Sequence, residues 1–347
     1  MKKVIWLTGV LLGFWMGLCV GQAVAVELTG AGATFPYPLY SKMFAEYYKE
    51  TGVRINYQAI GSGGGIGQLL SKVVDFGASD VYVDDEGLKK FSAPILHIPI
   101  TAGAVVITYN LPGRPKLRLT GEIIAKIFLG EITNWNDPRI KELNPDVNLP
   151  NLKIIVVHRS DGSGTTFIFS DYLCKVSEEW KNKVGRGKAL NWPCGLGGKG
   201  NPGVAGLVKQ LPGAIGYVEL TYALSNNMPY ADVKNKAGRF ITPTVESVSL
   251  AADIKLPDDM RVSLTDTSSE NGYPISGFTW ILVYKDLAKG GLTREKAEAL
   301  VDLLWWMTHN AQKYTSDLHY APLSNSARKK VERIIKSISY HGEPLLR

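Results

Sequence analysis

Three turns rich in Gly, Ser and Thr, each placed just before an expected helix, are the segments of this chain best suited to hold an anion. They span residues 29–36, 60–65 and 159–165. The start of a helix offers unpaired backbone N–H groups and a partial positive charge, and small residues let an anion approach that backbone. Ser and Thr are also ordinary helix caps, so one such turn carries little weight. Three turns in one chain favour an anion site over capping alone.

Arg159, at the start of the third turn, has the right chemistry for the same anion. Its planar guanidinium can donate two parallel hydrogen bonds to adjacent oxygens. The alternative is a surface arginine paired with Asp161. Both can hold together, because a neighbouring carboxylate would fix the orientation of the guanidinium.

Asp80, which ends the segment 75–80, is harder to reconcile with an anion. A carboxylate repels an oxyanion unless a proton lies between them. Phosphate keeps at least one proton near neutral pH, whereas sulfate has none. An acceptor at this position therefore favours phosphate and penalises sulfate.

Several catalytic and metal-binding patterns are missing from the sequence. The histidines, at positions 97, 158, 309, 319 and 341, form no H-E-x-x-H, and there is no C-x-x-C pair, so a zinc site has no support. The glycine run 61–67 lacks the lysine of a P-loop and the third glycine of G-x-G-x-x-G, and no serine lies in G-x-S-x-G. We therefore expect no metal, no cofactor and no enzyme.

Besides the binding of phosphate, three other functions stay open at this point. An enzyme acting on phosphate esters would use Asp80 or Asp161 as general base, but the sequence offers it neither metal ligands nor a convincing nucleophile–base pair. A binding module for another oxyanion, such as sulfate or molybdate, would gain nothing from Asp80. An adhesive role for a secreted binding protein is the third.

The composition is that of a globular, exported protein. The chain has 347 residues, of which 45% are hydrophobic and 20% are charged, and its formal net charge is +7. Two lysines, an apolar stretch and an A-x-A site predict a signal peptide over residues 1–25, cleaved after Ala25. A retained membrane anchor is the alternative. Nucleic-acid binding is not expected, because no broad basic patch with interleaved aromatic residues is present.

Cysteine usage agrees with export. Loss of Cys19 with the signal peptide leaves Cys174 and Cys194. In an oxidising compartment a disulfide between them is the default expectation, and it would stabilise the fold by about 3 kcal/mol. Two unpaired thiols are the alternative, because the sequence does not report their separation.

Short apolar runs alternate with longer amphipathic stretches after residue 25. This pattern predicts an α/β fold with ligand sites at the carboxyl ends of strands. Strands are expected over residues 53–60, 94–109, 152–158, 214–219 and 279–284. Helices are expected over residues 37–51, 66–74, 121–129, 165–176 and 293–310, and the basic stretch 328–333 is expected to form a solvated helix face.

Several motifs together closely resemble the periplasmic phosphate-binding proteins of ABC-type phosphate transporters. They span residues 29–36, 74–80, 159–165, 195–201 and 211–219, and the likeness covers essentially the whole mature chain. The resemblance implies a two-lobed type II periplasmic-binding-protein fold with a ligand cleft between α/β lobes joined by crossover strands. The implied division is a signal peptide (1–25), a first lobe (26–109 and 278–347) and a second lobe (110–277).

The resemblance also implies a phosphate site. The residues that match the ligands of the family are Thr34, Phe35, Ser62, Asp80, Arg159, Ser163, Gly164 and Thr165. Asp80 would accept the phosphate proton, Arg159 would donate its fork, and Asp161 would orient Arg159. The chain departs from the family pattern at Gly63 and His158, neither of which is among those ligands, and in having Cys174 and Cys194.

The function implied by the resemblance is that of a periplasmic receptor. It would deliver inorganic phosphate to the membrane permease and ATPase subunits of a phosphate ABC transporter. Phosphate would bridge both lobes and so favour the closed arrangement. We expect a monomer, because each ligand contact is available within one chain.

Overall fold

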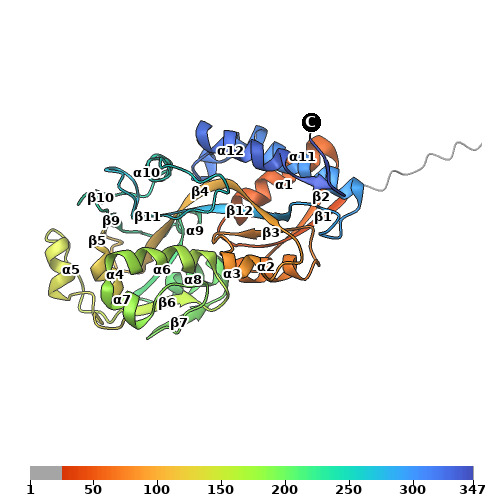
Figure 1. Cartoon of the computed structure of the whole chain (residues 1–347). Coiled ribbons are helices and arrows are strands. Elements are labelled where there is room, and N and C mark those ends of the chain that lie inside the picture. The colour runs from red at the N-terminus through yellow and green to blue at the C-terminus, as the bar shows by residue number, and fades with distance from the viewer. Residues whose placement is uncertain (1–25, 347) are drawn as a thin grey trace, which may run out of the picture.

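Nine strands of the part of the chain that the structure describes, residues 26–346, form one curled sheet (Figure 1). The structure is a computed structural model. The strand order is β2-β1-β3-β12-β4-β8-β6-β7, and β11 pairs with β12. The strands are β1 (Glu27–Gly32), β2 (Arg54–Ala59), β3 (Phe76–Ser79), β4 (Ile95–Tyr109), β6 (Ile155–Arg159), β7 (Leu196–Gly198), β8 (Ala214–Glu219), β11 (Leu264–Thr265) and β12 (Ile275–Tyr284).

The long strand β4 is shared by two sides of this sheet. Its residues 95–104 pair with β12, and its residues 105–109 pair with β8. We call β2, β1, β3 and β12 the β1 side, and β8, β6 and β7 the β6 side. On the β1 side, β1 runs parallel to β2 and β3; on the β6 side, β6 runs parallel to β7 and β8. Each side therefore contains a small parallel unit of three strands, and ligand sites of such units lie at the carboxyl ends of their strands.

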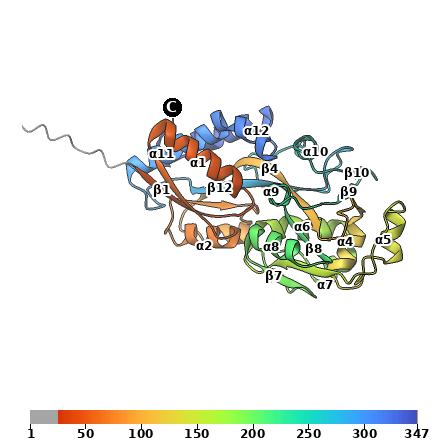
Figure 2. The same ribbon diagram turned by 180° about the vertical axis from the view of Figure 1, so that it is seen from behind.

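Helices pack against both faces of the sheet (Figures 1 and 2). Around the β1 side, α1, α11 and α12 gather on one face and α2 lies on the other. The bounds there are α1 (Tyr37–Thr51), α2 (Ser62–Leu70), α3 (Asp85–Leu88), α11 (Arg294–Thr308) and α12 (Asn325–Lys336), with 3-10 helices η1 (Asn310–Tyr314) and η2 (Ser316–Leu318).

The remaining helices lie between β4 and β12 along the chain. The helices are α4 (Gly121–Phe128), α5 (Pro138–Leu143), α6 (Gly164–Val176), α7 (Glu178–Lys183), α8 (Gly200–Gln210), α9 (Leu220–Ser225) and α10 (Val245–Ala251). Two small sheets complete the structure, β10 (Phe240–Ile241) with β9 (Asp232–Lys234) and β5 (Arg118–Leu119), and β13 (Ser339–Tyr340) with β14 (Glu343–Pro344).

The local sequence explains why α1 begins and ends where it does. Its buried residues Leu39, Tyr40, Met43, Phe44 and Tyr47 recur at helical spacing and pack into the core. Pro36 precedes its first turn, and Gly52 ends it in a left-handed conformation with a φ of 74°. The turn that contains Thr34 and Phe35 is thereby fixed between β1 and α1.

The expected strands at residues 53–60, 94–109, 152–158, 214–219 and 279–284 are confirmed as β2, β4, β6, β8 and β12, with shifted ends. Helices α1, α4, α6 and α11 are also confirmed, and the basic stretch 328–333 lies in α12 with its apolar residues buried. The prediction of a helix at residues 66–74 was wrong in its bounds, because α2 spans Ser62–Leu70. The strands β1 and β3 were missed.

Close packing of glycines accounts for these misses. A Cβ at Gly30 would lie 2.2 Å from the Phe76 ring, and one at Gly32 would lie 1.9 Å from the carbonyl oxygen of Ala78. A Cβ at Gly65 would lie 2.5 Å from Gly32 Cα, so glycine lets the first turn of α2 settle onto β1. Such residues form strands and helices through tertiary contact, and they carry no apolar periodicity for the sequence to reveal.

The predicted disulfide is not formed in the structure, in which Cys174 and Cys194 are both free cysteines. Cys174 lies near the end of α6 and lines a hollow together with Lys175 and Arg186. Cys194 precedes β7, lines a different hollow, and directs its Sγ to the Phe128 carbonyl oxygen at 3.6 Å. The two thiols therefore have different surroundings, which their spacing in the sequence did not reveal.

The predicted signal peptide and its cleavage after Ala25 lie outside the described residues. Within residues 26–346, no helix has the length and apolar character needed to cross a membrane.

Candidate functional site

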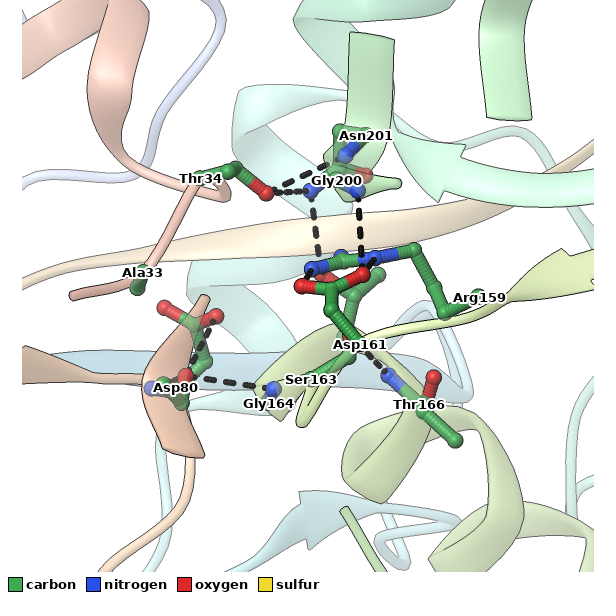
Figure 3. A network of polar contacts seen from close by, with 12 residues as sticks. Ala33, Thr34, Asp80, Arg159, Asp161, Ser163, Gly164, Thr166, Gly200 and Asn201 are labelled. Carbon is green, nitrogen blue, oxygen red and sulfur yellow. Dashed lines mark hydrogen bonds and ion pairs between the residues drawn. The ribbon is translucent and has the colours of Figure 1, made fainter. Parts of the chain in front are cut away.

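The turns that follow β1, β2 and β6 meet between the two sides of the sheet. Figure 3 shows part of this meeting point, with Thr34 and Asp80 on one side and Arg159 and Gly164 on the other. Ser62, the first residue of α2, accepts at its Oγ a hydrogen bond from the Gly164 N–H of α6 at 3.1 Å. Beside it, the Gly63 N–H donates to the Gly162 carbonyl oxygen at 2.8 Å. Thr34 is joined to the β6 side by hydrogen bonds from Asn201. The three turns singled out in the sequence therefore come together in one place.

The polar side chains at this meeting point are almost completely buried. None of them exposes more than 4% of its surface, and they are Thr34, Ser62, Asp80, Arg159, Ser163 and Thr165. Burying a polar or charged group is costly unless it has partners. The partners of each group therefore indicate what the site can bind.

The start of α6 shows how the sequence shapes the site. Ser163 caps the helix, its Oγ accepting a hydrogen bond from the Thr166 N–H at 3.0 Å. A Cβ at Gly164 would lie 2.4 Å from the Ser62 Oγ and 2.7 Å from an oxygen of Asp80. Glycine thus lets the positive end of α6 approach the β1 side, where the Gly164 N–H donates to Ser62.

The Ser62 hydroxyl has both of its acceptor positions filled. Its Oγ accepts from the Asp80 N–H and from the Gly164 N–H, each at 3.1 Å. A hydroxyl can accept two hydrogen bonds and donate one. Ser62 is therefore left as a donor, and its nearest acceptor is an Asp80 oxygen at the long distance of 3.4 Å.

The hydroxyls of Thr34 and Thr165 are in the same condition. The Thr34 Oγ1 accepts from the Asn201 N–H at 3.1 Å and from its Nδ2 at 2.9 Å. The Thr165 Oγ1 accepts from the Arg159 Nη1 at 3.2 Å and from the Asn201 Nδ2 at 3.1 Å. Both hydroxyls can therefore only donate. A group of buried hydroxyls committed to donation is suited to an anion with several oxygens.

Arg159 supplies a buried positive charge whose direction is fixed. Its Nε and Nη2 donate to the two oxygens of Asp161 at 2.7 and 2.5 Å, and the Gly200 N–H donates to the same carboxylate at 3.0 Å. Burial opposes ionisation of Asp161, but Arg159 and this N–H hold its pKa below the usual range. A guanidinium has five N–H donors. The contacts to Asp161 and Thr165 occupy three, so two stay available to an anion.

Asp80 is a buried carboxyl group on the β1 side. Its Oδ1 accepts from the Thr279 Oγ1 at 2.8 Å, and its Oδ2 faces Ser62. Burial raises the pKa of Asp80 to about 7, against the opposing influence of Thr279, Arg159 and Ser62. Near neutral pH this carboxyl group can both hold a proton and accept one.

The structure thus brings Thr34, Ser62, Asp80, Arg159, Ser163, Gly164 and Thr165 into one cluster, with Asp161 beside Arg159 as expected. Phe35 lies at its edge. The Phe35 ring is fully buried, and its carbonyl oxygen accepts from the Tyr320 hydroxyl at 2.7 Å. The contacts of these residues with a ligand stay predictions.

Sequence reasoning missed Asn201 and Thr279. Asn201 lies in the segment 195–201, which was noted only for its resemblance to a family, and no motif surrounds Thr279. Residue type alone could not find them, because buried Asn and Thr side chains occur throughout protein cores. Among residues 26–346, the structure places no group of three or more His, Cys, Asp or Glu side chains where they could hold a metal ion.

Comparison with known proteins bears on this cluster. A family model described as PBP superfamily domain matches residues 20–308. The phosphate-binding protein PstS of Xylella fastidiosa (strain Temecula1) is 47% identical over 320 residues, covering 90% of this chain and 85% of that protein. The phosphate-binding protein PstS of Pasteurella multocida (strain Pm70) is 44% identical over 313 residues, covering 89% of each.

Among solved structures, the high-affinity periplasmic phosphate-binding protein PfluDING, bound with phosphate, aligns with a TM-score of 0.70 at 20% identity. The alignment covers 89% of this chain and 93% of that one. It confirms the predicted two-lobed type II periplasmic-binding-protein fold. The relatives confirm that this is a binding protein and not an enzyme. The chain belongs to the PstS family of phosphate-binding proteins, within the PBP superfamily.

Proposed function

We propose that this chain is an extracytoplasmic receptor that binds inorganic phosphate between the β1 and β6 sides and delivers it to an ABC-type phosphate import permease. The observation that carries the proposal is that two buried groups come from opposite sides of the site: the Arg159 guanidinium held by Asp161, and the carboxyl group of Asp80. The first offers N–H donors to phosphate oxygens, and the second offers an acceptor to the phosphate proton.

Hydrogen bonds and helix ends do most of the binding in this proposal. Arg159 is balanced by Asp161 within the same cluster, so the site has little excess positive charge. The donors are instead the three committed hydroxyls, the start of α6 and the free N–H groups of Arg159. The ligand set we propose is Thr34, Phe35, Ser62, Asp80, Arg159, Ser163, Gly164 and Thr165, with Asp161 orienting Arg159.

Selectivity follows from the proton. Monohydrogen and dihydrogen phosphate can both donate to an Asp80 oxygen, whereas sulfate would place a lone pair against it. Rejection by an unpaired buried acceptor is stronger than rejection by size, because the acceptor loses water without gaining a partner. Asp80 is therefore the proposed selectivity residue.

Lobe closure is the proposed consequence of binding. We propose a first lobe of residues 26–109 and 278–347 and a second lobe of residues 110–277. The ligand set draws on both, and β4 passes from one side of the sheet to the other. Since only the closed arrangement offers all contacts together, bound phosphate would favour it.

PfluDING is a periplasmic phosphate-binding protein, and another protein of similar structure, from Vibrio cholerae, is an ABC-type phosphate transport receptor. For this chain we propose cleavage of the signal peptide after Ala25, a monomeric receptor, and docking onto permease and ATPase subunits of a phosphate importer. Every proposed ligand comes from a single chain, which supports the monomer.

Calorimetric titration of the protein beginning at Val26, stripped of bound ligand, tests the proposal. We expect one phosphate per chain with a dissociation constant in the micromolar range or below. Incubation with a generic phosphate ester, with and without divalent metal, should give no turnover. The absence of phosphate binding would overturn the receptor function, and metal-dependent turnover would restore the enzyme alternative.

A further inference from the structure

Asn201 is a fully buried side chain that contacts hydroxyls from both sides of the site. It is the second residue of α8. Its Nδ2 donates to the Thr34 Oγ1 at 2.9 Å on the β1 side and to the Thr165 Oγ1 at 3.1 Å on the β6 side. Figure 3 shows it above Arg159, directed at Thr34. Asn201 is not among the residues that match the ligands of the family.

The orientation of the Asn201 amide is fixed from behind. Its Oδ1 accepts a hydrogen bond from the Glu219 N–H at 2.9 Å, at the end of β8. Because a backbone N–H can only donate, the oxygen of the amide must face Glu219 and the NH₂ group must face the two threonines. The backbone at the end of β8 thus fixes the hydrogen bonds that the Thr34 and Thr165 hydroxyls accept from Asn201.

The consequence lies in the protons of those hydroxyls. With Asn201 present, Thr34 and Thr165 accept two hydrogen bonds each, so their own protons are free to point at a ligand. Without the amide, each threonine would regain an acceptor position. It could then turn its proton toward a neighbouring oxygen or bind water, and the site would have to reorder before an anion entered.

Asn201 also joins the two sides. Thr34 follows β1, whereas Thr165 and Glu219 belong to the β6 side. The contact with Thr34 is therefore made only when the two sides are together. One side chain combines closure with the alignment of two hydroxyl donors.

We propose that Asn201 is a positioning residue of the phosphate site, which bridges the two lobes and commits the Thr34 and Thr165 hydroxyls to donate to the anion without touching it. This inference rests on the proposed function and names a determinant of affinity within it. The role is separate from selectivity, since both hydroxyls would donate equally well to phosphate and to other oxyanions.

The chain offers a matched control. Asn144 is also buried, and its side chain also makes three hydrogen bonds, accepting from the Arg118 N–H and donating to the Arg118 and Ile140 carbonyl oxygens. None of its partners belongs to the phosphate cluster. Asn144→Ala therefore removes the same number of bonds from the fold but none from the site.

Calorimetric titration with inorganic phosphate, together with thermal melting of each ligand-free variant, tests the inference. We expect Asn201→Ala to weaken phosphate binding by about tenfold or more, whereas Asn144→Ala lowers the melting temperature with affinity within about twofold of the original protein. In a Thr34→Val background, Asn201→Ala should cost at least threefold less in affinity than it does alone, because one of its two targets is gone.

Two results would overturn the inference. One is an Asn201→Ala variant that folds and binds phosphate as tightly as the original protein. The other is an equal loss with and without the Thr34 hydroxyl, which would assign Asn201 a purely structural role. Failure of the original protein to bind phosphate would instead overturn the proposed function, so the two failures are distinguishable.

Discussion

The two sides of the site use the same residue type for opposite purposes. On the β6 side, Asp161 faces the Arg159 guanidinium, and its pKa lies below the usual range although burial opposes this. On the β1 side, Asp80 has the hydroxyls of Thr279 and Ser62 as partners, and burial raises its pKa to about 7. A carboxylate beside a cation stays ionised and orients it, while one beside hydroxyls can share a proton. The partner decides the role of each carboxyl group.

Removal of Arg159 is expected to have the largest effect on phosphate binding. Hydrogen bonds to charged groups contribute about 1.5–3 kcal/mol each, so we expect Arg159→Ala to weaken phosphate binding by about 100-fold or more. Calorimetric titration checks this, with thermal melting as the measure of folding. A folded variant that retains affinity within about threefold would contradict the proposed role.

The surface provides a control for this variant. Arg139 pairs with Asp137 two residues before it through the same fork, with Nε–Oδ1 and Nη2–Oδ2 distances of 2.9 and 2.8 Å, but its side chain is 42% exposed. Arg139→Ala should leave phosphate affinity unchanged. The contrast would show that the buried position of Arg159, and not the arginine–aspartate pair as such, makes a binding group.

Asp80→Asn removes the carboxyl group on the β1 side and is expected to change selectivity. An amide can turn its NH₂ group to an anion that carries no proton, so the penalty against sulfate should fall. We expect the ratio of phosphate to sulfate affinity to drop by about tenfold or more, measured by titration with each anion. Unchanged selectivity would remove Asp80 from the selectivity mechanism.

Glu219 extends the comparison of Asp80 and Asp161 to a buried carboxyl group outside the proposed ligand set. It accepts from the Thr221 N–H and the Tyr320 hydroxyl, each at 2.9 Å, and burial raises its pKa to about 8. Because its pKa is higher in the folded state, the contribution of Glu219 to stability is present at low pH and is lost as pH rises through about 8.

Glu219→Gln stays neutral and avoids that loss. We expect the stability of the variant relative to the original protein to increase by at least about 1 kcal/mol between pH 5 and pH 9. A difference of one in pKa between the folded and unfolded states corresponds to about 1.4 kcal/mol. Urea unfolding of both ligand-free proteins at each pH checks this. A difference that is constant or falls with pH would show that Glu219 is ionised when folded.

Asp161→Asn is expected to have the smallest effect on binding. The amide oxygen can still accept from Arg159 or Gly200, and removal of a negative charge eases the approach of an anion. These changes oppose each other, so phosphate affinity should stay within about threefold of the original, while the melting temperature falls. A loss above tenfold would mean that orientation of Arg159 dominates binding.

Much of the fold followed from apolar patterning. The strands β4, β8 and β12 are long or continuously apolar, and α1 has a clear buried face, so their residues alone specified them. By contrast, β1 and β3 consist largely of small residues, and their strand conformation depends on packing against each other, as Gly30 does against the Phe76 ring, and against α2. No local signal distinguishes such strands from turns.

The site was predictable where a residue type carried its own chemistry. Arg159, Asp80 and the Gly/Ser/Thr turns stand out in the sequence because few residue types can bind an anion. Asn201 and Thr279 act only through their neighbours, so their roles depend on contacts between segments far apart in the chain. The prediction of a disulfide was wrong for the same reason, because pairing depends on the distance between Cys174 and Cys194, which the sequence does not contain.

Competition between phosphate and sulfate on the unaltered protein tests the central claim most directly. The ligand-free protein beginning at Val26 would be titrated with phosphate at neutral pH, alone and in a 100-fold excess of sulfate. A buried guanidinium facing a buried proton acceptor predicts tight phosphate binding that the sulfate does not diminish. Sulfate that competes with comparable affinity would contradict the division of roles between Arg159 and Asp80.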